Sequence, residues 1–260
     1  MINAVPLFSG SSGNCTFVES GETKVLIDAG VSCLSVTKAL REIGRSIEDI
    51  SAVFVTHEHC DHIKGLLAFY NATGKKIFCH YNSVDGIIKK IKISKSALVR
   101  FDSKFELGDF VIDPFEVSHD VFCVGFNIYE NSNKISIVTD LGYTTNVVVQ
   151  RLYDSRLVIL EANHDEKMVM TGKYPPILKS RILSKKGHLS NTNSAKVVAE
   201  LAQHNVKQIV FGHLSEENNT PQVCYDTIAK YLESVGIEPQ VNIKLDIAKP
   251  HGVGPIYVVK

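Results

Sequence analysis

Residues 56–62 read Thr-His-Glu-His-Cys-Asp-His and gather four residues of the types that bind divalent metals in proteins. A buried apolar strand is predicted just before them. Since alternate residues of an extended segment point the same way, we expect His57 and His59 to project side by side toward one divalent ion. Asp61 and His62 lie one step further along, where the chain turns into a helix, and suit a second ion. The competing interpretation is a histidine-rich polar loop that binds no metal.

Two metal ions need more ligands than one loop supplies, so other parts of the chain must contribute the rest. His119, Asp140 and His213 each stand at the end of a hydrophobic strand pattern and just before a polar or glycine-containing turn. Asp28 ends a further apolar strand pattern. Ligand-type residues that recur at strand ends are the arrangement expected of a site built on the rim of a sheet.

The elements that position these residues alternate short strands with helices. Strand patterns occupy residues 23–28, 52–56, 75–80, 110–117, 123–130, 134–140, 156–162, 206–213, 241–245 and 255–260. Helical patterns occupy residues 33–44, 63–74, 191–205 and 221–236. In the first helix, Leu34, Ala39 and Leu40 form the predicted buried stripe. Strands dominate the first half of the chain and strand–helix alternation the second. This order predicts two packed sheets with helices outside, an α/β fold of four layers, αββα.

Length and composition set limits on these predictions. The chain has 260 residues, 44% of them hydrophobic and 22% charged, which fits a globular protein with a sizeable core. Lys plus Arg and Asp plus Glu number 28 each, so nucleic acid would have to be attracted by a local basic patch. We find no apolar run of the ~20 residues that span a membrane and no secretion signal. The six cysteines are scattered. We therefore expect no membrane partner and a cytoplasmic location.

Taken in order, these residues resemble the metallo-β-lactamase superfamily, whose signature is His-x-His-x-Asp-His. The resemblance covers nearly the whole chain and implies a single metallo-β-lactamase-fold domain, residues 1–260, with two divalent ions. By this resemblance the first ion is held by His57, His59 and His119, the second by Asp61, His62 and His213, and both by the bridging Asp140. Asp28 resembles an aspartate that orients a ligand from behind. Cys60 fills the variable position of the signature, where packing and zinc binding are the alternatives.

A second segment, Gly-His-Leu-Ser at residues 187–190, precedes a helix and the strand that ends at His213. This order resembles the tRNA-processing and β-CASP phosphodiesterase branches of the superfamily. The resemblance implies that His188 contacts the scissile phosphate and assists catalysis, while His213 binds metal. The alternative is that His188 only caps or packs beside the following helix.

Charge and local motifs point to the substrate. Residues 167–186, directly before this segment, hold six basic residues and no acidic one, as suits an approach path for a phosphodiester; a solvated loop is the alternative. The glycine- and serine-rich residues 8–14, with Glu-Ala-Asn-His-Asp at 161–165 and His-Leu-Ser-Glu-Glu-Asn-Asn at 213–219, resemble the YycJ/WalJ subgroup, which is regarded as DNA exonucleases. His164 is expected to support the site rather than to bind metal.

Together these features predict a binuclear, metal-dependent hydrolase, a phosphodiesterase or nuclease of the DNA exonuclease type. In the predicted mechanism the ions share a hydroxide, Asp61 orients it and takes its proton, and His188 stabilises the phosphoryl oxygens or protonates the leaving group. Zn or Mn is expected, and the ligand set also permits Fe. The expected partner is nucleic acid, DNA in preference to RNA, and the oligomeric state is left open. The alternatives are a thioester or lactone hydrolase on the same site and a non-hydrolytic metal-binding regulator.

Overall fold

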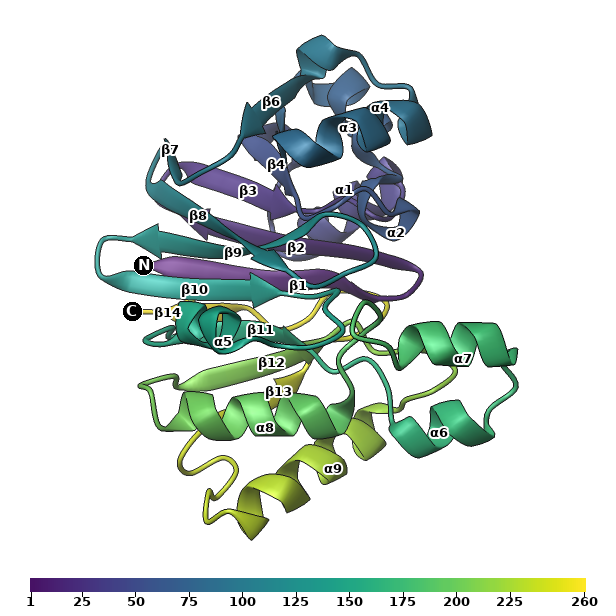
Figure 1. Ribbon diagram of the computed structural model, residues 1–260. Coiled ribbons are helices and arrows are strands. Elements are labelled where there is room, and N and C mark those ends of the chain that lie inside the picture. The colour runs from purple at the N-terminus through teal and green to yellow at the C-terminus, as the bar shows by residue number, and fades with distance from the viewer.

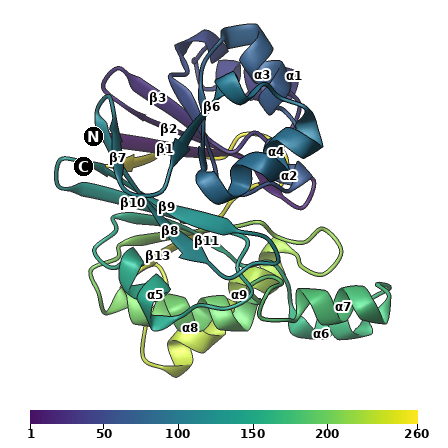
Figure 2. The ribbon, with the colours of Figure 1, turned by 45° about the horizontal axis from the view of Figure 1, so that its top comes forward.

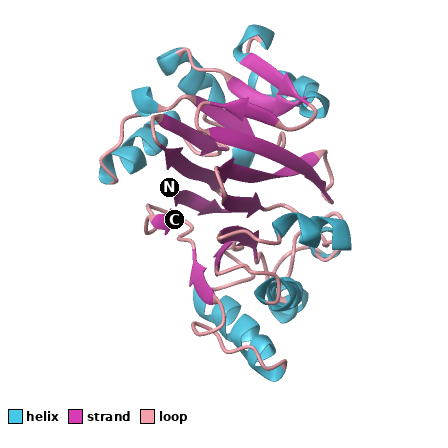
Figure 3. Ribbon diagram, turned by 90° about the vertical axis from the view of Figure 1, so that its left-hand side faces the viewer, coloured by secondary structure: helices cyan, strands magenta, loops and turns pink.

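Two seven-stranded mixed sheets, packed face to face, form the centre of the protein in the computed structural model, which describes residues 1–260 (Figure 1). In spatial order the first sheet consists of β14 (Tyr257–Val259), β1 (Ile2–Gly10), β2 (Gly13–Ser20), β3 (Thr23–Ile27), β4 (Ala52–Val55), β5 (Ile77–His80) and β6 (Leu98–Phe101). The second consists of β13 (Lys244–Ile247), β12 (Gln208–Gly212), β11 (Leu157–Glu161), β10 (Asn133–Val138), β9 (Cys123–Glu130), β8 (Phe110–Val117) and β7 (Phe105–Leu107). Because helices lie outside the paired sheets (Figure 3), the predicted four-layer αββα fold is confirmed.

Each sheet is parallel on one side and antiparallel on the other. Strands β3 to β6 run parallel in the first sheet, and strands β10 to β13 run parallel in the second. Strand β9 is antiparallel to both β8 and β10, so β8 runs in the same direction as β10. The carboxyl ends of these strands therefore reach one edge of each sheet, and this is the edge where binding residues collect in α/β proteins.

Helices cover both outer faces (Figure 2). The first sheet is accompanied by α1 (Cys33–Glu42), α2 (Cys60–Ile63), α3 (Leu66–Thr73) and α4 (Val84–Ile91), and the second by α5 (Asn146–Leu152), α8 (Asn191–Ala202) and α9 (Pro221–Ser234). The chain also makes three short 3₁₀ turns, η1 (Ile47–Asp49), η2 (Tyr81–Ser83) and η3 (Lys95–Ala97). The pair α6 (Glu166–Thr171) and α7 (Pro176–Ile182) forms a helical arm that projects on the side away from the chain ends (Figure 1). None of the helices has the length and apolar character needed to cross a membrane.

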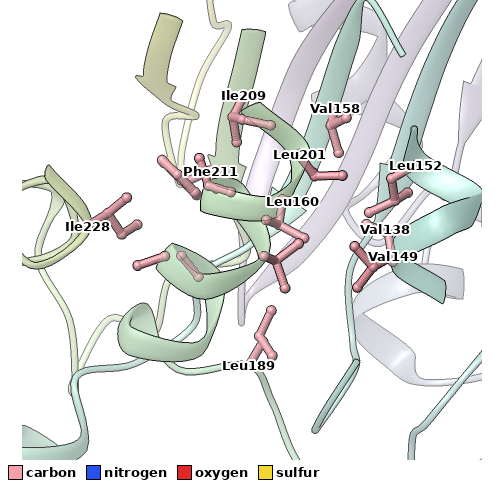
Figure 4. Packing of buried hydrophobic residues seen from close by; sticks show 14 of the residues in the cluster. Val138, Val149, Leu152, Val158, Leu160, Leu189, Leu201, Ile209, Phe211 and Ile228 are labelled. Atoms are coloured by element: carbon pink, nitrogen blue, oxygen red, sulfur yellow. The ribbon is translucent and has the colours of Figure 1, made fainter. Parts of the chain in front are cut away.

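Three hydrophobic clusters separate the four layers. Between the sheets, the rings of Phe54 in β4 and Phe126 in β9 lie 6.0 Å apart, measured between centroids. Behind the second sheet, Leu160, Leu201 and Phe211 belong to one buried cluster that also includes side chains of α9 (Figure 4). A third cluster lies between the first sheet and α1, α3 and α4. Each large apolar side chain removed from water stabilises the fold by about 1.5–3 kcal/mol, so the rim of the sheets rests on a rigid scaffold.

Two details of the sequence prediction are wrong. Leu34 is 64% exposed, and Val36 joins the buried stripe of α1 instead, because it lies three residues before Ala39 and so shares its helix face. Strand β13 begins at Lys244 rather than at residue 241, because its parallel pairing with β12 begins there. The basic stretch, for which a solvated loop was the alternative, forms the helical arm and the turn that follows it.

Candidate metal centre

The candidate site lies where strand ends of both sheets meet. Asp28 directly follows β3 and His213 directly follows β12, while His57 and Asp140 come two residues after β4 and β10. Asp28, Asp140 and His213 have positive φ angles of 62°, 60° and 57°. Left-handed backbone at a residue other than glycine costs on the order of 1–3 kcal/mol and collects at functional sites. Each of these residues makes a sharp turn at its strand end, which keeps its side chain at the rim.

Three imidazoles form one half of the site, here called the three-histidine group: His57, His59 and His119. The ring centroid of His57 lies 4.6 Å from that of His59 and 5.1 Å from that of His119, and His119 Nε2 is 3.2 Å from His59 Nδ1. One nitrogen from each ring lies within 4.8 Å of the others, close enough to hold one ion. Burial lowers the pKa of each imidazole, so the rings are neutral and offer lone pairs to a metal.

The other half, here called the carboxylate group, consists of Asp61, His62, Asp140 and His213. His62 Nε2 lies 3.2 Å from Asp140 Oδ2 and 3.4 Å from Asp61 Oδ2. His213 is 3.5 Å from Asp140 through Nδ1 and 3.7 Å from Asp61 through Nε2. Asp140 also approaches His119 Nε2 to 4.0 Å, so its carboxylate stands between the two groups.

Negative charge reverses the effect of burial in the carboxylate group. Burial alone would lower the pKa of His62, but the charges of Asp140 and Asp28 raise it well above its ordinary value. Burial is likewise outweighed at His213, whose pKa is raised to about 10 by the charge of Asp140 and by hydrogen bonds to neighbouring carboxylates. Burial raises the pKa of Asp61 and Asp140, yet the adjacent histidines hold it below the ordinary value. Without a metal, both histidines are therefore protonated at neutral pH.

The residues present fit divalent cations. His57 Nε2 is buried and has no hydrogen-bond partner. Such an orphaned atom costs about 1–3 kcal/mol, and a cation held by the three-histidine group would satisfy it. The donors are imidazole nitrogen and carboxylate oxygen without thiolate, a set that suits Zn²⁺ and Mn²⁺.

The sequence of residues 23–214 matches a family model described as a beta-lactamase superfamily domain. The chain belongs to the metallo-β-lactamase superfamily. It is 32% identical to exodeoxyribonuclease WalJ of Streptococcus pneumoniae over 256 residues, which are 96% of this chain and 95% of WalJ. It is also 32% identical to exodeoxyribonuclease YycJ of Bacillus anthracis, over 88% of this chain and 89% of YycJ. These two similarities place it in the WalJ/YycJ group, as predicted.

Solved structures confirm the superfamily fold. The metallo-β-lactamase fold protein YhfI of Bacillus subtilis superposes with a TM-score of 0.71 at 18% identity, over 98% of this chain and 99% of YhfI. At that identity the likeness extends to the fold alone. The residues of the site must therefore be judged from their own geometry.

The structure brings every predicted site residue of this superfamily member to the same rim. His59, Asp61, Asp140, His188 and His213 line a cavity of about 290 Å³ together with residues of the β1–β2 turn, α4 and the helical arm. The remaining predicted ligands, which are almost completely buried behind this cavity, are His57, His62 and His119. Their roles as metal ligands remain predictions.

Asp28, which was expected to orient a metal ligand, contacts the predicted ligand His62. Asp28 Oδ2 lies 2.7 Å from His62 Nδ1, which directs His62 Nε2 toward the carboxylate group. The Asp28 carboxylate also accepts hydrogen bonds from the backbone N–H and the hydroxyl of Thr56, at 2.8 and 2.9 Å. Hydrogen bonds to a charged group contribute about 1.5–3 kcal/mol each, so the ring of His62 is firmly held.

Glu161, at the end of β11, is a site residue that the sequence analysis missed. It is completely buried, and its carboxylate lies 2.9 Å from His188 Nδ1 and 2.6 Å from His213 Nδ1. It also accepts backbone N–H hydrogen bonds from Leu141 and Leu189, both at 3.0 Å. Burial would raise the pKa of Glu161, but His188 and His213 lower it to about 2, so the carboxylate is ionised. The sequence feature that could have identified Glu161 is a glutamate at the end of an otherwise apolar strand.

Asp120 was also missed. Its Oδ1 lies 3.3 Å from Nε2 of both His59 and His119, and its other oxygen pairs with Arg181 of the helical arm. This aspartate therefore connects the three-histidine group to the arm. Its position directly after His119 was the only indication in the sequence.

His164, His204 and Cys60 lie outside the ligand groups. His164 is buried, but it belongs to none of the clusters that could hold a metal. His204 stacks on Tyr153 with ring centroids 3.7 Å apart, away from the rim. Cys60 is exposed and lines the cavity, but its thiol is not among the converging ligand atoms.

Proposed function

We propose that the protein is a metal-dependent hydrolase that cleaves phosphodiester bonds in nucleic acid and acts as an exonuclease on DNA. The observation that carries the proposal is the convergence of both ligand groups and a histidine–glutamate pair at one rim. The similarity to the exodeoxyribonucleases WalJ and YycJ supports the choice of DNA. Residues 1–260 are proposed to act as one domain, since β14 near the carboxyl end pairs with β1.

Two divalent ions, Zn or Mn with Fe as a further possibility, are proposed for the site. The three-histidine group would hold one ion, and Asp61, His62 and His213 would hold the other, with Asp140 between them. When bound, such ions polarise a phosphoryl oxygen and lower the pKa of a water molecule, which supplies a nucleophile near neutral pH.

Two side chains that face the cavity are proposed to handle protons. Asp61 is 27% exposed and is ionised, so its carboxylate can orient the attacking water and accept its proton. His188 is 22% exposed, and Nδ1 contacts Glu161, which leaves Nε2 as the free ring nitrogen. A protonated His188, stabilised by Glu161, would donate to a phosphoryl oxygen and then to the leaving oxygen.

The surroundings of the cavity favour a polyanion. Lys90 of α4 and Arg181 of the helical arm line the cavity itself. The arm and the turn after it carry six basic residues and no acidic one from 167 to 186. A strand of nucleic acid would meet this charge on its way to the ions. All six cysteines are free thiols, which supports our proposal of a cytoplasmic location.

The decisive test is cleavage of end-labelled single- and double-stranded DNA and RNA by Mn- or Zn-loaded protein. We expect DNA to be shortened progressively from one end, and Asp61→Ala to abolish this shortening. Equal cleavage by Asp61→Ala would assign the activity to a contaminant. Faster hydrolysis of thioesters or lactones than of any nucleic acid, unaffected by His188→Ala, would replace the proposal with the ester-hydrolase alternative.

A further inference from the structure

A second cavity, larger than the one at the metal centre, lies beside that centre. Its volume is about 580 Å³, which is within the usual range of pockets for small organic ligands. Four segments line it: the end of β5 with η2, the residues after β6, the last part of β8 and the start of β9. The lining residues are His80, Tyr81, Asn82, Asp102, Ser103, Pro114, Phe115, Glu116, Phe122 and Val124.

Aromatic rings form one wall of this cavity. The ring of His80 stacks on that of Phe122 with centroids 4.2 Å apart and an angle of 23° between the planes. Tyr81 lies on the same ring system, 4.4 Å from His80, and is 56% exposed. A tyrosine left this exposed at the mouth of a cavity offers a free face on which a flat ring can stack. Base–aromatic stacking is the usual way in which proteins hold single-stranded nucleic acid.

The two charged side chains of the cavity, Asp102 and Glu116, are hydrogen-bond acceptors. The carboxylates of Asp102 and Glu116 both lie close enough to His80 to oppose the lowering of its pKa by burial. No lysine or arginine lines the cavity. The negative charge of the two carboxylates repels a phosphate, and their oxygens accept hydrogen bonds from amino groups. The cavity therefore suits the base of a nucleotide rather than its backbone. Carboxylates accept from the exocyclic amine of cytosine, whereas thymine presents a carbonyl oxygen at that position.

The segments that line this cavity lie next to segments of the metal centre, although the two cavities have no lining residue in common. Cys79 pairs with Val55, so His80 lies beside Thr56, the residue before His57. The backbone N–H of Val124 donates to the carbonyl of Thr56 at 3.1 Å. On the other side, Phe122 is two residues after Asp120, so their Cα atoms are at most ~7 Å apart. A nucleotide with its base in the cavity would therefore have its backbone near the metal centre.

We propose that this cavity is a base-binding subsite: it receives one base of the nucleic-acid substrate, stacked on Tyr81 and Phe122, and Asp102 and Glu116 favour bases that carry an exocyclic amine. The inference rests on the proposed function and adds a sequence preference to it. In this proposal the metal centre cleaves the nucleic-acid backbone, the helical arm attracts that backbone, and the subsite binds a neighbouring base.

The first test measures binding, so that it does not depend on catalysis. Short phosphorothioate-linked oligodeoxycytidine and oligodeoxythymidine, which resist cleavage, are titrated into metal-loaded protein and followed by fluorescence anisotropy. We expect tighter binding of the cytidine strand. Tyr81→Ala should weaken both strands about tenfold or more, since stacking of one base changes affinity by one to two orders of magnitude. Tyr81→Phe, which keeps the ring, should bind as the wild type does. Combined Asp102→Asn and Glu116→Gln should remove the preference for cytidine.

The second test compares kcat/KM for a DNA strand with that for bis-p-nitrophenyl phosphate, a diester without a base. We expect Tyr81→Ala and Phe122→Ala to lower the ratio of the two values about tenfold. Val147→Ala, an exposed substitution on α5, serves as the control for handling and folding. A ratio and affinities within twofold of wild type in both variants, with unchanged thermal melting, would overturn the subsite. Wild-type protein that binds DNA through Tyr81 but hydrolyses neither substrate would refute the nuclease proposal and leave the subsite standing.

Discussion

The two halves of the metal centre hold protons in opposite ways. In the three-histidine group, burial lowers the pKa of His57, His59 and His119, and nothing close by offsets that effect fully. In the carboxylate group, neighbouring negative charges raise the pKa of His62 and His213. The same residue type at the same rim is thus neutral in one half and protonated in the other. The difference is set by where the carboxylates lie.

This contrast explains how a buried cluster of acids remains stable before a metal binds. Buried carboxylates without counter-charge are costly, and protons on two histidines supply the missing positive charge. A metal ion entering the carboxylate group must displace those protons, whereas an ion entering the three-histidine group displaces none. The two halves should therefore respond differently to mutation and to pH.

The largest expected effect comes from the residue that stands between the halves. Asp140→Asn keeps the side-chain shape and tolerates the left-handed backbone, but it removes the negative charge shared by both groups. We expect DNA cleavage to fall by on the order of 10³-fold or more, because the charge that holds the ions is lost. Asp154→Asn is the matched control, since Asp154 has φ of 61° and pairs with Asn205. Equal activity of the two variants would contradict the central place of Asp140.

Removal of His188 should lower activity somewhat less, because we propose that His188 supports the reaction without holding an ion. We expect His188→Ala to lower kcat about 10²- to 10³-fold while metal content stays unchanged. His204→Ala, which removes a histidine stacked on Tyr153, should keep full activity. If His188→Ala instead lost one ion per chain, His188 would be a ligand and the division into two groups would need revision.

The pH dependence of metal binding tests the contrast directly. His62 and His213 have raised pKa values in the metal-free protein, about 10 for His213, so they are protonated at neutral pH and must lose protons on binding. Affinity for the ion in the carboxylate group should rise with pH up to the pKa of His213, about 10, by about tenfold per pH unit for each proton displaced. The ion in the three-histidine group should show little change above neutral pH. Calorimetric titrations in two buffers of different ionisation enthalpy would count the protons, and an identical count for both ions would remove the contrast.

The smallest effect is expected at Cys60. Its thiol lies in the cavity wall but outside both groups, so Cys60→Ser should change activity less than twofold and leave the metal content unchanged. Loss of an ion in this variant, measured by elemental analysis, would show that the thiolate is a ligand and would restore the zinc-binding alternative for this position.

The places of several site residues at the rim could be predicted from the sequence because each of these residues follows an apolar strand, and that pattern is local and can be recognised without knowledge of the fold. His57, Asp140 and His213 are all of this kind. Glu161 was overlooked because its importance depends on contacts across the fold: it meets His188 and His213, which are 27 and 52 residues away. Such a partner cannot be identified from spacing alone.

The helical arm shows the other limit of the sequence. No residue of α7 is buried, so the segment lacks the apolar periodicity by which a helix is recognised. Its basic character was clear from composition, but its projection from the rim was not. The error at Leu34 also comes from a weak periodic signal, because a short helix offers too few residues to decide which face is buried.

Metal stoichiometry is the most direct test of the account. Elemental analysis of carefully purified, Mn- or Zn-loaded protein should give two ions per chain for the wild type. The same analysis of His213→Ala, which removes a predicted ligand of the carboxylate group only, should give one. Wild-type protein without a bound transition metal, or a His213→Ala variant that still binds two ions, would contradict a two-ion centre divided between these groups.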